Sequence, residues 1–188
     1  MIGIISYGLG NVTAFQSCFR ELDIQAEPVT DPNKLKNYTH IILPGVGAFD
    51  EAITRLHRTG FYNEIINSSQ NGIFLLGICV GMQVLANSSD EGELNGLNLV
   101  PGNVRSLKNI SKNHNLLMPH MGWNQVKFLD KKSIFKGFED NDEFYFLHSY
   151  YYECDSNDNE ISTTNYGSDF CTAVNKENIY GVQFHPEK

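Results

Sequence analysis

No stretch of the 188-residue chain approaches the roughly twenty consecutive apolar residues that a membrane-spanning helix needs, so we do not expect a membrane protein. Basic residues are also scarce: 14 Lys and Arg stand against 22 Asp and Glu, and the formal net charge is −8. Because the basic residues are scattered, the attraction that underlies nucleic-acid binding is missing. The first residues lack the basic leader of a signal peptide, which favours a cytoplasmic protein.

Paired cysteines and linkers are missing as well. The four cysteines are far apart and form no C-x-x-C pair, which argues against a zinc site and, in a cytoplasmic chain, against disulfides. We therefore expect no metal and no cofactor. No low-complexity segment divides the chain, and its length suits a single domain over residues 1–188.

Apolar runs typical of buried strands are present three times in the first half, each followed by apolar residues at helical spacing. Such alternation indicates a mostly parallel sheet with helices on both faces, an α/β fold. The three strand and helix pairs are IGIIS with residues 12–22, HIILP with residues 48–66, interrupted near Gly60, and GIFLLGIC with VGMQVLANSS.

After Gly92 the pattern changes to short strand-like runs separated by turn residues. Since no linker separates the two halves, we expect these strands to extend the same sheet. The runs are LVPGNVRSL, WNQVKFL, FYFLHSYYYEC, EISTTNY, CTAVNKE and NIYGVQF.

Cys79 lies in GICVG, between a predicted strand and a predicted helix. The G-x-C-x-G pattern is typical of a nucleophile elbow, in which small neighbours permit a strained turn that lifts the central side chain above the sheet. The free N–H groups at the start of a helix favour the thiolate form of such a cysteine. The alternative is that Cys79 is a small buried apolar residue, as most free cysteines are.

The last residues, GVQFHPEK, contain His185 and Glu187 two positions apart, so that both side chains point the same way along an extended segment. An imidazole and the carboxylate that orients it complete a catalytic triad with Cys79, since the order along the chain is free to vary. PGVG, residues 44–47, offers backbone N–H groups for an oxyanion hole. A simple strand-ending turn is the alternative for PGVG.

Together PGVGAF, GICVGMQ and GVQFHPEK resemble the class I (triad) glutamine amidotransferases in order and separation. The resemblance implies a flavodoxin-like α/β sandwich with extra C-terminal antiparallel strands. It also implies that Cys79 attacks the side-chain amide of glutamine, with His185 acting as base and then acid and Glu187 orienting His185. Gly47 and Val80 would then supply the oxyanion hole.

Matching the family's glutamine pocket implies that Gln83 and Glu91 hold the amino-acid end of the substrate, with the backbone of Ser149 and Tyr150. Each has another interpretation: Gln83 as a solvated helix residue, Glu91 as part of an acidic loop, and the Ser149 region as ordinary strand. We interpret His148 as a hydrogen-bonded structural residue and leave it out of the triad.

Within the family, YGLGN, MPHMGWN and FYFLHSY are similar to the glutaminase subunits of imidazole glycerol phosphate synthase, the HisH group. This similarity implies that ammonia passes to a partner, a HisF-type (βα)8-barrel subunit that makes imidazole glycerol phosphate and an aminoimidazole carboxamide ribotide. Asn11, Trp123 and Tyr145 match interface positions, although the two aromatics suit core packing equally.

Three alternatives remain open at this point. Related paralogues supply ammonia to an amidotransferase of nucleotide-sugar or surface-polysaccharide synthesis, and the same motifs match them. A stand-alone cysteine hydrolase and a non-catalytic binding protein share the scaffold, although the complete triad opposes the latter. The family resemblance also implies a final helix, which we expect to be missing from a chain that ends at Lys188.

Overall fold

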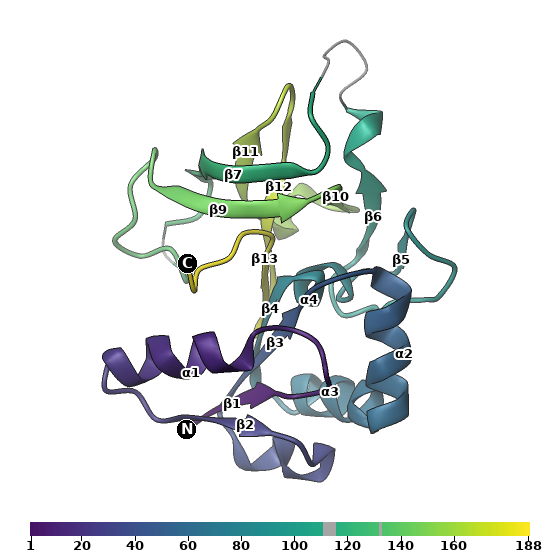
Figure 1. The fold of residues 1–188 in the computed structure, drawn as a ribbon, viewed down its shortest axis with the longest axis vertical. Coiled ribbons are helices and arrows are strands. Elements are labelled where there is room, and N and C mark those ends of the chain that lie inside the picture. The colour runs from purple at the N-terminus through teal and green to yellow at the C-terminus, as the bar shows by residue number, and fades with distance from the viewer. Residues whose placement is uncertain (111–115, 132) are drawn as a thin grey trace.

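The computed structural model describes residues 1–110, 116–131 and 133–188 (Figure 1). Its first half alternates strands and helices, as the apolar pattern predicts. The elements are β1 (Ile2–Ile5), α1 (Val12–Glu21), β2 (Ala26–Val29), the 3-10 helix η1 (Pro32–Asn37), β3 (His40–Gly45), α2 (Phe49–Thr59), α3 (Phe61–Gln70), β4 (Phe74–Cys79), α4 (Val80–Gln83) and β5 (Ser88–Ser89).

The second half of the described chain is built of strands joined by turns and three-residue 3-10 helices. Its elements are β6 (Gly102–Ser106), η2 (Leu107–Asn109), β7 (His120–Gln125), β8 (Lys127–Phe128), β9 (Glu143–His148), β10 (Tyr150–Cys154), η3 (Asn157–Asn159), β11 (Glu160–Asn165), β12 (Asp169–Lys176) and β13 (Ile179–Val182).

One large sheet forms the centre of the molecule, in the order β2-β1-β3-β4-β13-β12-β10-β6-β5. The first five of these strands are parallel, the pairs β13 with β12, β12 with β10 and β10 with β6 are antiparallel, and β6 with β5 is parallel. Figure 1 shows α1 on one side of the sheet and α2 and α3 on the other. The α/β class is confirmed.

Helices α1 and α2 lie where the sequence predicts, whereas α3 continues to Gln70, beyond the predicted end at Ile66. Asn11 caps α1, and its side-chain oxygen accepts a hydrogen bond from the N–H of Ala14 at 3.1 Å. Gly60 separates α2 from α3 with a left-handed φ of 81°. Leu22 is the exception, because it follows the last turn of α1 and is 66% exposed.

The helix predicted over residues 80–89 is wrong beyond its first turn, since α4 ends at Gln83. The carbonyl oxygens that would continue the helix accept hydrogen bonds from a distant segment instead. Leu97 N–H donates to Val84 at 2.7 Å, and Leu99 N–H donates to Leu85 at 2.9 Å. Long-range backbone pairing therefore replaces the local helical bonds here.

The expectation that all later strands extend the main sheet is only partly correct. Strands β7 and β9 pair with each other in a separate two-stranded sheet, with His120 opposite His148 and Gln125 opposite Glu143. The run FYFLHSYYYEC, which resembles one strand, is broken at Ser149, so β9 and β10 belong to different sheets. Figure 1 shows β7 and β9 lying across the antiparallel part of the main sheet.

Among the residues that the structure describes, no helix is long and apolar enough to cross a membrane. The four cysteines are all free thiols. Within the same residues, no group of three or more His, Cys, Asp or Glu side chains is arranged to hold a metal ion.

Candidate active site

Cys79 occupies a strained corner between β4 and α4, with φ 56° and ψ −114°. A residue other than glycine rarely adopts positive φ, so the surrounding structure has to hold this conformation. The three nearest glycines leave no room for a side chain: a Cβ at Gly77 would collide with Gly81, one at Gly81 with Leu43, and one at Gly45 with Gly81. The geometry is that of the predicted nucleophile elbow.

Sheet topology brings the three predicted motifs to one edge. Because β3, β4 and β13 are adjacent and parallel, their carboxyl ends lie side by side, with Gly45 opposite Cys79. The chain after β13 then crosses toward the smaller sheet, where the His185 N–H donates to the Tyr145 carbonyl of β9 at 2.9 Å. A polar site at this edge is the usual arrangement in open α/β sheets.

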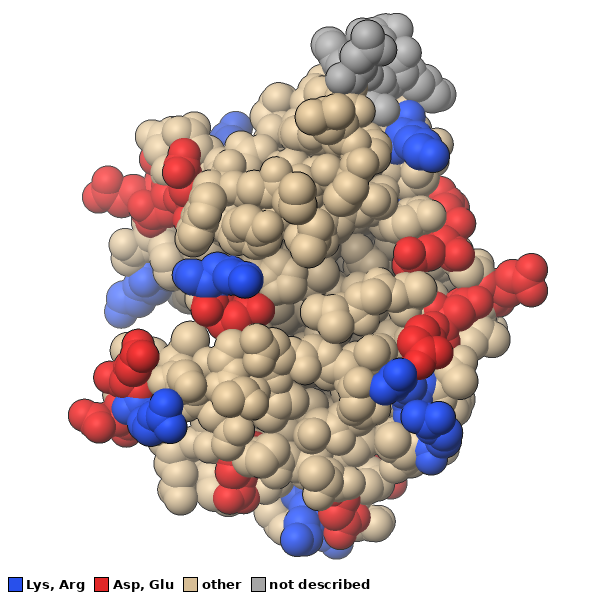
Figure 2. Space-filling view, in the orientation of Figure 1, with Lys and Arg blue, Asp and Glu red and all other residues tan. Residues whose placement is uncertain are grey.

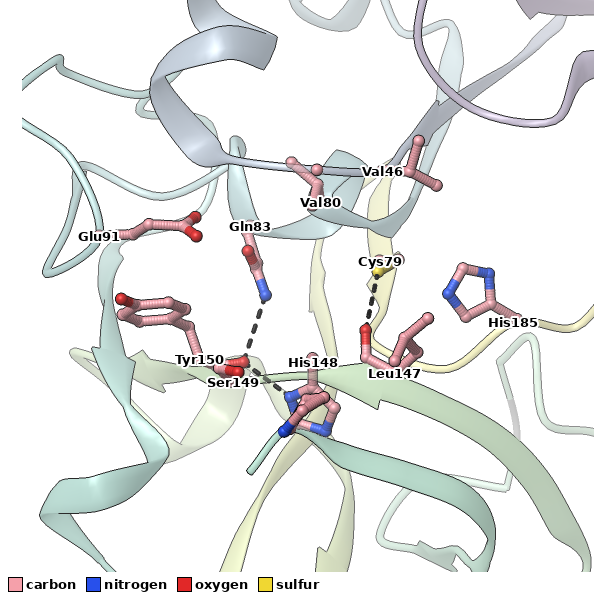
Figure 3. Close-up of a pocket in the computed structure, with 12 residues that line it drawn as sticks. Val46, Cys79, Val80, Gln83, Glu91, Leu147, His148, Ser149, Tyr150 and His185 are labelled. Atoms are coloured by element: carbon pink, nitrogen blue, oxygen red, sulfur yellow. Dashed lines mark hydrogen bonds between the residues drawn. The ribbon is translucent and has the colours of Figure 1, made fainter. Parts of the chain in front are cut away.

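His185 and Glu187 form a close, largely buried pair. His185 Nδ1 lies 2.9 Å from Glu187 Oε1, and the two side chains are 10% and 7% exposed. This contact directs the other ring nitrogen of His185 toward Cys79, and Figure 3 shows the ring beside the sulfur. Sulfur, imidazole and carboxylate thus lie together in the order that a triad requires.

The surroundings of His185 act on its pKa in opposite directions. Burial of the ring lowers the pKa, whereas hydrogen bonding and attraction to Cys79 and Glu187 raise it. The second effect is larger, and the pKa of His185 rises to about 10. The ring therefore carries a proton at neutral pH and can act as a proton donor.

A pocket of about 300 Å³ opens in front of Cys79 (Figure 3). Cys79 is only 4% exposed, yet it lines this pocket, so the thiol is not sealed in the core. Gly47, with φ 90°, and Val80 also line it, the two positions predicted to supply oxyanion N–H groups. The remaining lining residues are Val46, Gln83, Glu91, Pro119, Leu147, His148, Ser149, Tyr150 and His185.

All four predicted glutamine-binding residues therefore lie around one cavity. Gln83 is 3% exposed, so its interpretation as a solvated helix residue is wrong, and its Nε2 donates to the Tyr150 carbonyl at 3.2 Å. Glu91 Oε2 accepts a hydrogen bond at 2.8 Å from the N–H of Phe49, the first residue of α2. Glu91 thus satisfies a free helix donor where α2 has no capping side chain of its own.

Gln183 is a site residue that the motifs do not single out. It is fully buried, and its Nε2 lies 3.7 Å from Cys79 Sγ. One signal could have found it: an extended segment places residues 183, 185 and 187 on the same side. A lone amide between Val182 and Phe184 is also an unusual choice for an apolar strand end.

His148 lines the pocket from β9 but has its own buried partners. Its Nδ1 lies 2.7 Å from the Tyr150 carbonyl, and its Nε2 lies 3.0 Å from His120 Nδ1. Burial lowers the pKa of His148 to about 3 and that of His120 to about 4, so both rings are neutral. These contacts agree with its interpretation as a structural residue.

The three predicted interface residues are all accessible. Asn11 is exposed at the start of α1, Trp123 is 58% exposed, and Tyr145 is half-buried with its ring 5.9 Å from that of Trp123. Core packing is therefore the wrong interpretation of Trp123. Lys188 Nζ lies 5.6 Å from the centre of the Tyr145 ring, so this aromatic face borders the end of the chain.

Comparison with known sequences gives a match over nearly the whole chain. The family described as "Glutamine amidotransferase class-I" matches residues 4–188. The chain is 50% identical over 190 residues to the imidazole glycerol phosphate synthase subunit HisH of Bdellovibrio bacteriovorus, covering 100% of this chain and 93% of that protein. A protein of the same name from Leptospira borgpetersenii is 43% identical, with the same coverage.

Solved structures agree on the fold. A crystal structure described as a glutamine amidotransferase superposes with a TM-score of 0.76 at 16% identity, covering 99% of this chain and 90% of that one. Another glutamine amidotransferase, from Thermotoga maritima, superposes with a TM-score of 0.69 at 20% identity, covering 99% of this chain and 75% of that one. At these identities the likeness concerns the fold alone.

Proposed function

The chain belongs to the class I glutamine amidotransferase family, and from this premise we propose that it is the glutaminase subunit of an imidazole glycerol phosphate synthase, acting in histidine biosynthesis. The observation that carries the proposal is the grouping of Cys79, His185 and Glu187 at a pocket of about 300 Å³, large enough for one small amino acid. Full-length similarity to several HisH subunits at 40% identity or more supports the pathway.

In the first half of the reaction, the Cys79 sulfur attacks the side-chain carbonyl carbon of glutamine. The charge that develops on the carbonyl oxygen is stabilised by the N–H groups of Gly47 and Val80, which line the pocket beside the sulfur. The protonated ring of His185 then donates its proton to the amide nitrogen, so the C–N bond breaks. Ammonia leaves, and a γ-glutamyl thioester remains on Cys79.

In the second half, His185 has become neutral and takes a proton from a water molecule. The water oxygen attacks the thioester carbonyl, the C–S bond breaks, and glutamate leaves. Glu187 holds the ring in the required orientation throughout, since its contact with Nδ1 leaves Nε2 for the reacting groups. The balance is one glutamine and one water converted to one glutamate and one ammonia.

The amino-acid end of glutamine binds at the opposite end of the pocket. The Glu91 carboxylate attracts the α-ammonium group, and the backbone of Ser149 and Tyr150 faces the α-carboxylate. Both amide protons of Gln83 are donated to protein groups, to Tyr150 and to Gln183, so its carbonyl oxygen is the atom left for the substrate.

The partner is a HisF-type barrel protein, docked over β7, β9 and the loop before α1. Met121 and Trp123 on β7 and Leu147 on β9 are 65%, 58% and 44% exposed, and Val46 at the pocket rim is 43% exposed. The centre of the face in Figure 2 carries few charged residues, whereas its rim carries both signs. An apolar centre with a charged rim is typical of a protein interface.

The decisive experiment is to isolate the full chain with whichever barrel protein co-purifies and to measure glutamate production. We expect weak hydrolysis of glutamine by the chain alone and a large increase with the barrel protein and its ribotide ligand. Cys79→Ala should abolish both. A partner from nucleotide-sugar synthesis would contradict the pathway but not the chemistry, and strong partner-independent hydrolysis of another substrate would contradict both.

A further inference from the structure

We infer that Gln183 is a further catalytic residue, whose side-chain N–H donates to the Cys79 sulfur and stabilises the thiolate. The inference rests on the proposed function in one respect, namely that Cys79 is the nucleophile. Gln183 Nε2 lies 3.7 Å from Cys79 Sγ, within reach of a hydrogen bond to sulfur, and the side chain is fully buried. It therefore touches the reacting atom itself.

The groups around the sulfur favour opposite protonation states. The Leu147 carbonyl oxygen lies 3.9 Å from Sγ and accepts a hydrogen bond from a thiol, but it repels a thiolate. Gln183 donates, so it favours the thiolate, as does the His185 ring. Burial, together with Cys79, raises the pKa of the Tyr7 phenol, which therefore stays neutral. The Cys79 sulfur therefore has two side-chain donors beside it, the neutral amide of Gln183 and the ring of His185.

The orientation of the Gln183 amide is fixed by its other neighbour. Gln83 Nε2 donates to Gln183 Oε1 at 2.9 Å, and only an oxygen can accept there. The Gln183 nitrogen consequently has to face Cys79. The backbone of Gln183 is held as well, because its N–H donates to the Thr172 carbonyl of β12 at 2.8 Å.

Gln83 is held in turn by a chain of hydrogen bonds with one possible direction. The Tyr150 carbonyl accepts from both Gln83 Nε2 and His148 Nδ1, so His148 Nε2 carries no hydrogen and accepts from His120 Nδ1. His120 Nε2 then accepts from the Asn124 amide at 3.1 Å. Each nitrogen and oxygen in this series of hydrogen bonds is therefore fixed as a donor or an acceptor. The amide of Gln183 consequently has a single orientation at the sulfur.

The test is the pH dependence of alkylation of Cys79 by iodoacetamide, in the full chain, with the modified cysteine identified by mass spectrometry. Gln183→Met keeps the length of the side chain but removes the donor. We expect the rate of Cys79 labelling on the acidic side of its pH profile to fall about tenfold, the effect of one hydrogen bond to a charged group.

Gln70→Met is the matched control, because Gln70 is exposed at the end of α3, and its labelling profile should equal that of the unmodified chain. Gln183→Asn retains the amide but shortens it, and it should shift the profile in the same direction. An unchanged labelling profile in a folded Gln183→Met or Gln183→Asn chain, with folding verified by circular dichroism, would overturn the inference.

The assay also separates this inference from the proposed function, because alkylation needs no glutamine. If the unmodified chain fails to hydrolyse glutamine while labelling of Cys79 still depends on Gln183, the proposed function is wrong and the inference stands. If the chain hydrolyses glutamine and Gln183→Met labels like the unmodified chain, the inference is wrong and the function stands.

Discussion

At the scale of single residues, the proton on His185 has the largest consequence for the reaction. Its pKa of about 10 means that the ring can donate to the departing nitrogen throughout the neutral range. The elevation depends on two neighbours that outweigh burial, one of which is the Glu187 carboxylate 2.9 Å away. The alkaline limit of catalysis is therefore set by local contacts.

Glu187→Gln should lower the His185 pKa, since it replaces a carboxylate by a neutral amide. In the unmodified chain the rate should fall only as pH rises through about 10, where the folded ring loses its proton. In the variant we expect this limit at lower pH and a turnover number reduced by about a hundredfold. The measurement is the pH profile of glutamate production; the exposed Glu177→Gln is the control. An unshifted alkaline limit would contradict the role of Glu187.

Gly81 tests the strained elbow in a different way. A Cβ at this position would overlap the Leu43 carbonyl of β3, so Gly81→Ala should displace α4 from the sheet. We expect activity to fall by at least tenfold, together with a loss of stability of about 1–3 kcal/mol from overpacking. Thermal melting and glutamate production measure the two effects. Gly72→Ala is a contrasting control, because a Cβ there meets nothing within 4 Å and any cost arises from its positive φ alone.

At the scale of elements, the sheet of β7 and β9 depends on two buried histidines that are neutral. Their folded pKa values, about 4 for His120 and about 3 for His148, lie below the ordinary value of 6.5. Between each folded pKa and 6.5, the unfolded chain therefore binds more protons than the folded chain. The free energy of unfolding consequently rises with pH over this range. The contribution is complete above pH 6.5 and is lost as pH falls toward 4.

Unfolding by urea should reveal this dependence. For His120 the difference between the ordinary and folded pKa corresponds to about 3 kcal/mol lost between pH 6.5 and pH 4. His120→Gln removes the titrating ring. The free energy of unfolding of this variant should therefore fall less steeply as the pH is lowered from 6.5 to 4. His40→Gln, at an exposed position, should keep the steep dependence of the unmodified chain. Parallel curves for all three chains would rule out this account.

Elements are predictable from the sequence where the signal is local. Apolar runs and helical spacing suffice for β1, β3, β4 and α1 to α3. Strand β2 escapes prediction, because it lies at the sheet edge, contains Pro28, and only Val29 is fully buried. The pairing of β7 with β9 and the end of α4 depend on segments far away in the chain, which periodicity cannot detect.

For the site, motifs predict which side chains lie together but not what holds them. Cys79, His185 and Glu187 do meet, and the catalytic roles assigned to them stay predictions. Gln183 escapes prediction because its two partners, Gln83 and Cys79, are 100 and 104 positions away in the sequence. Its position could be read from strand alternation; its contacts could not.

At the scale of the whole molecule, the exposed aromatic face predicts where association energy is concentrated. Trp123→Ala should weaken binding of the barrel protein by about 2 kcal/mol or more, as buried tryptophans at interface centres do. The free energy of unfolding of the Trp123→Ala variant should change little, because the Trp123 side chain is 58% exposed in the isolated chain. Titration calorimetry and urea unfolding measure the two quantities. Leu94→Ala, 39% exposed in the acidic loop, is the control. Unimpaired binding of Trp123→Ala would remove this face from the interface.

The two-stranded sheet of β7 and β9 has one exposed face and one buried face. In β9 the side chain of Leu147 is 44% exposed, while Phe146 and His148 are buried, and Leu147 also lines the pocket beside Cys79. A substitution at Met121 or Trp123 on the exposed face of β7 can therefore change partner binding and leave the lining of the pocket intact, whereas one at Leu147 alters both. A relative that supplies ammonia to a different acceptor should therefore differ at Met121 and Trp123 and keep the residues that line the pocket.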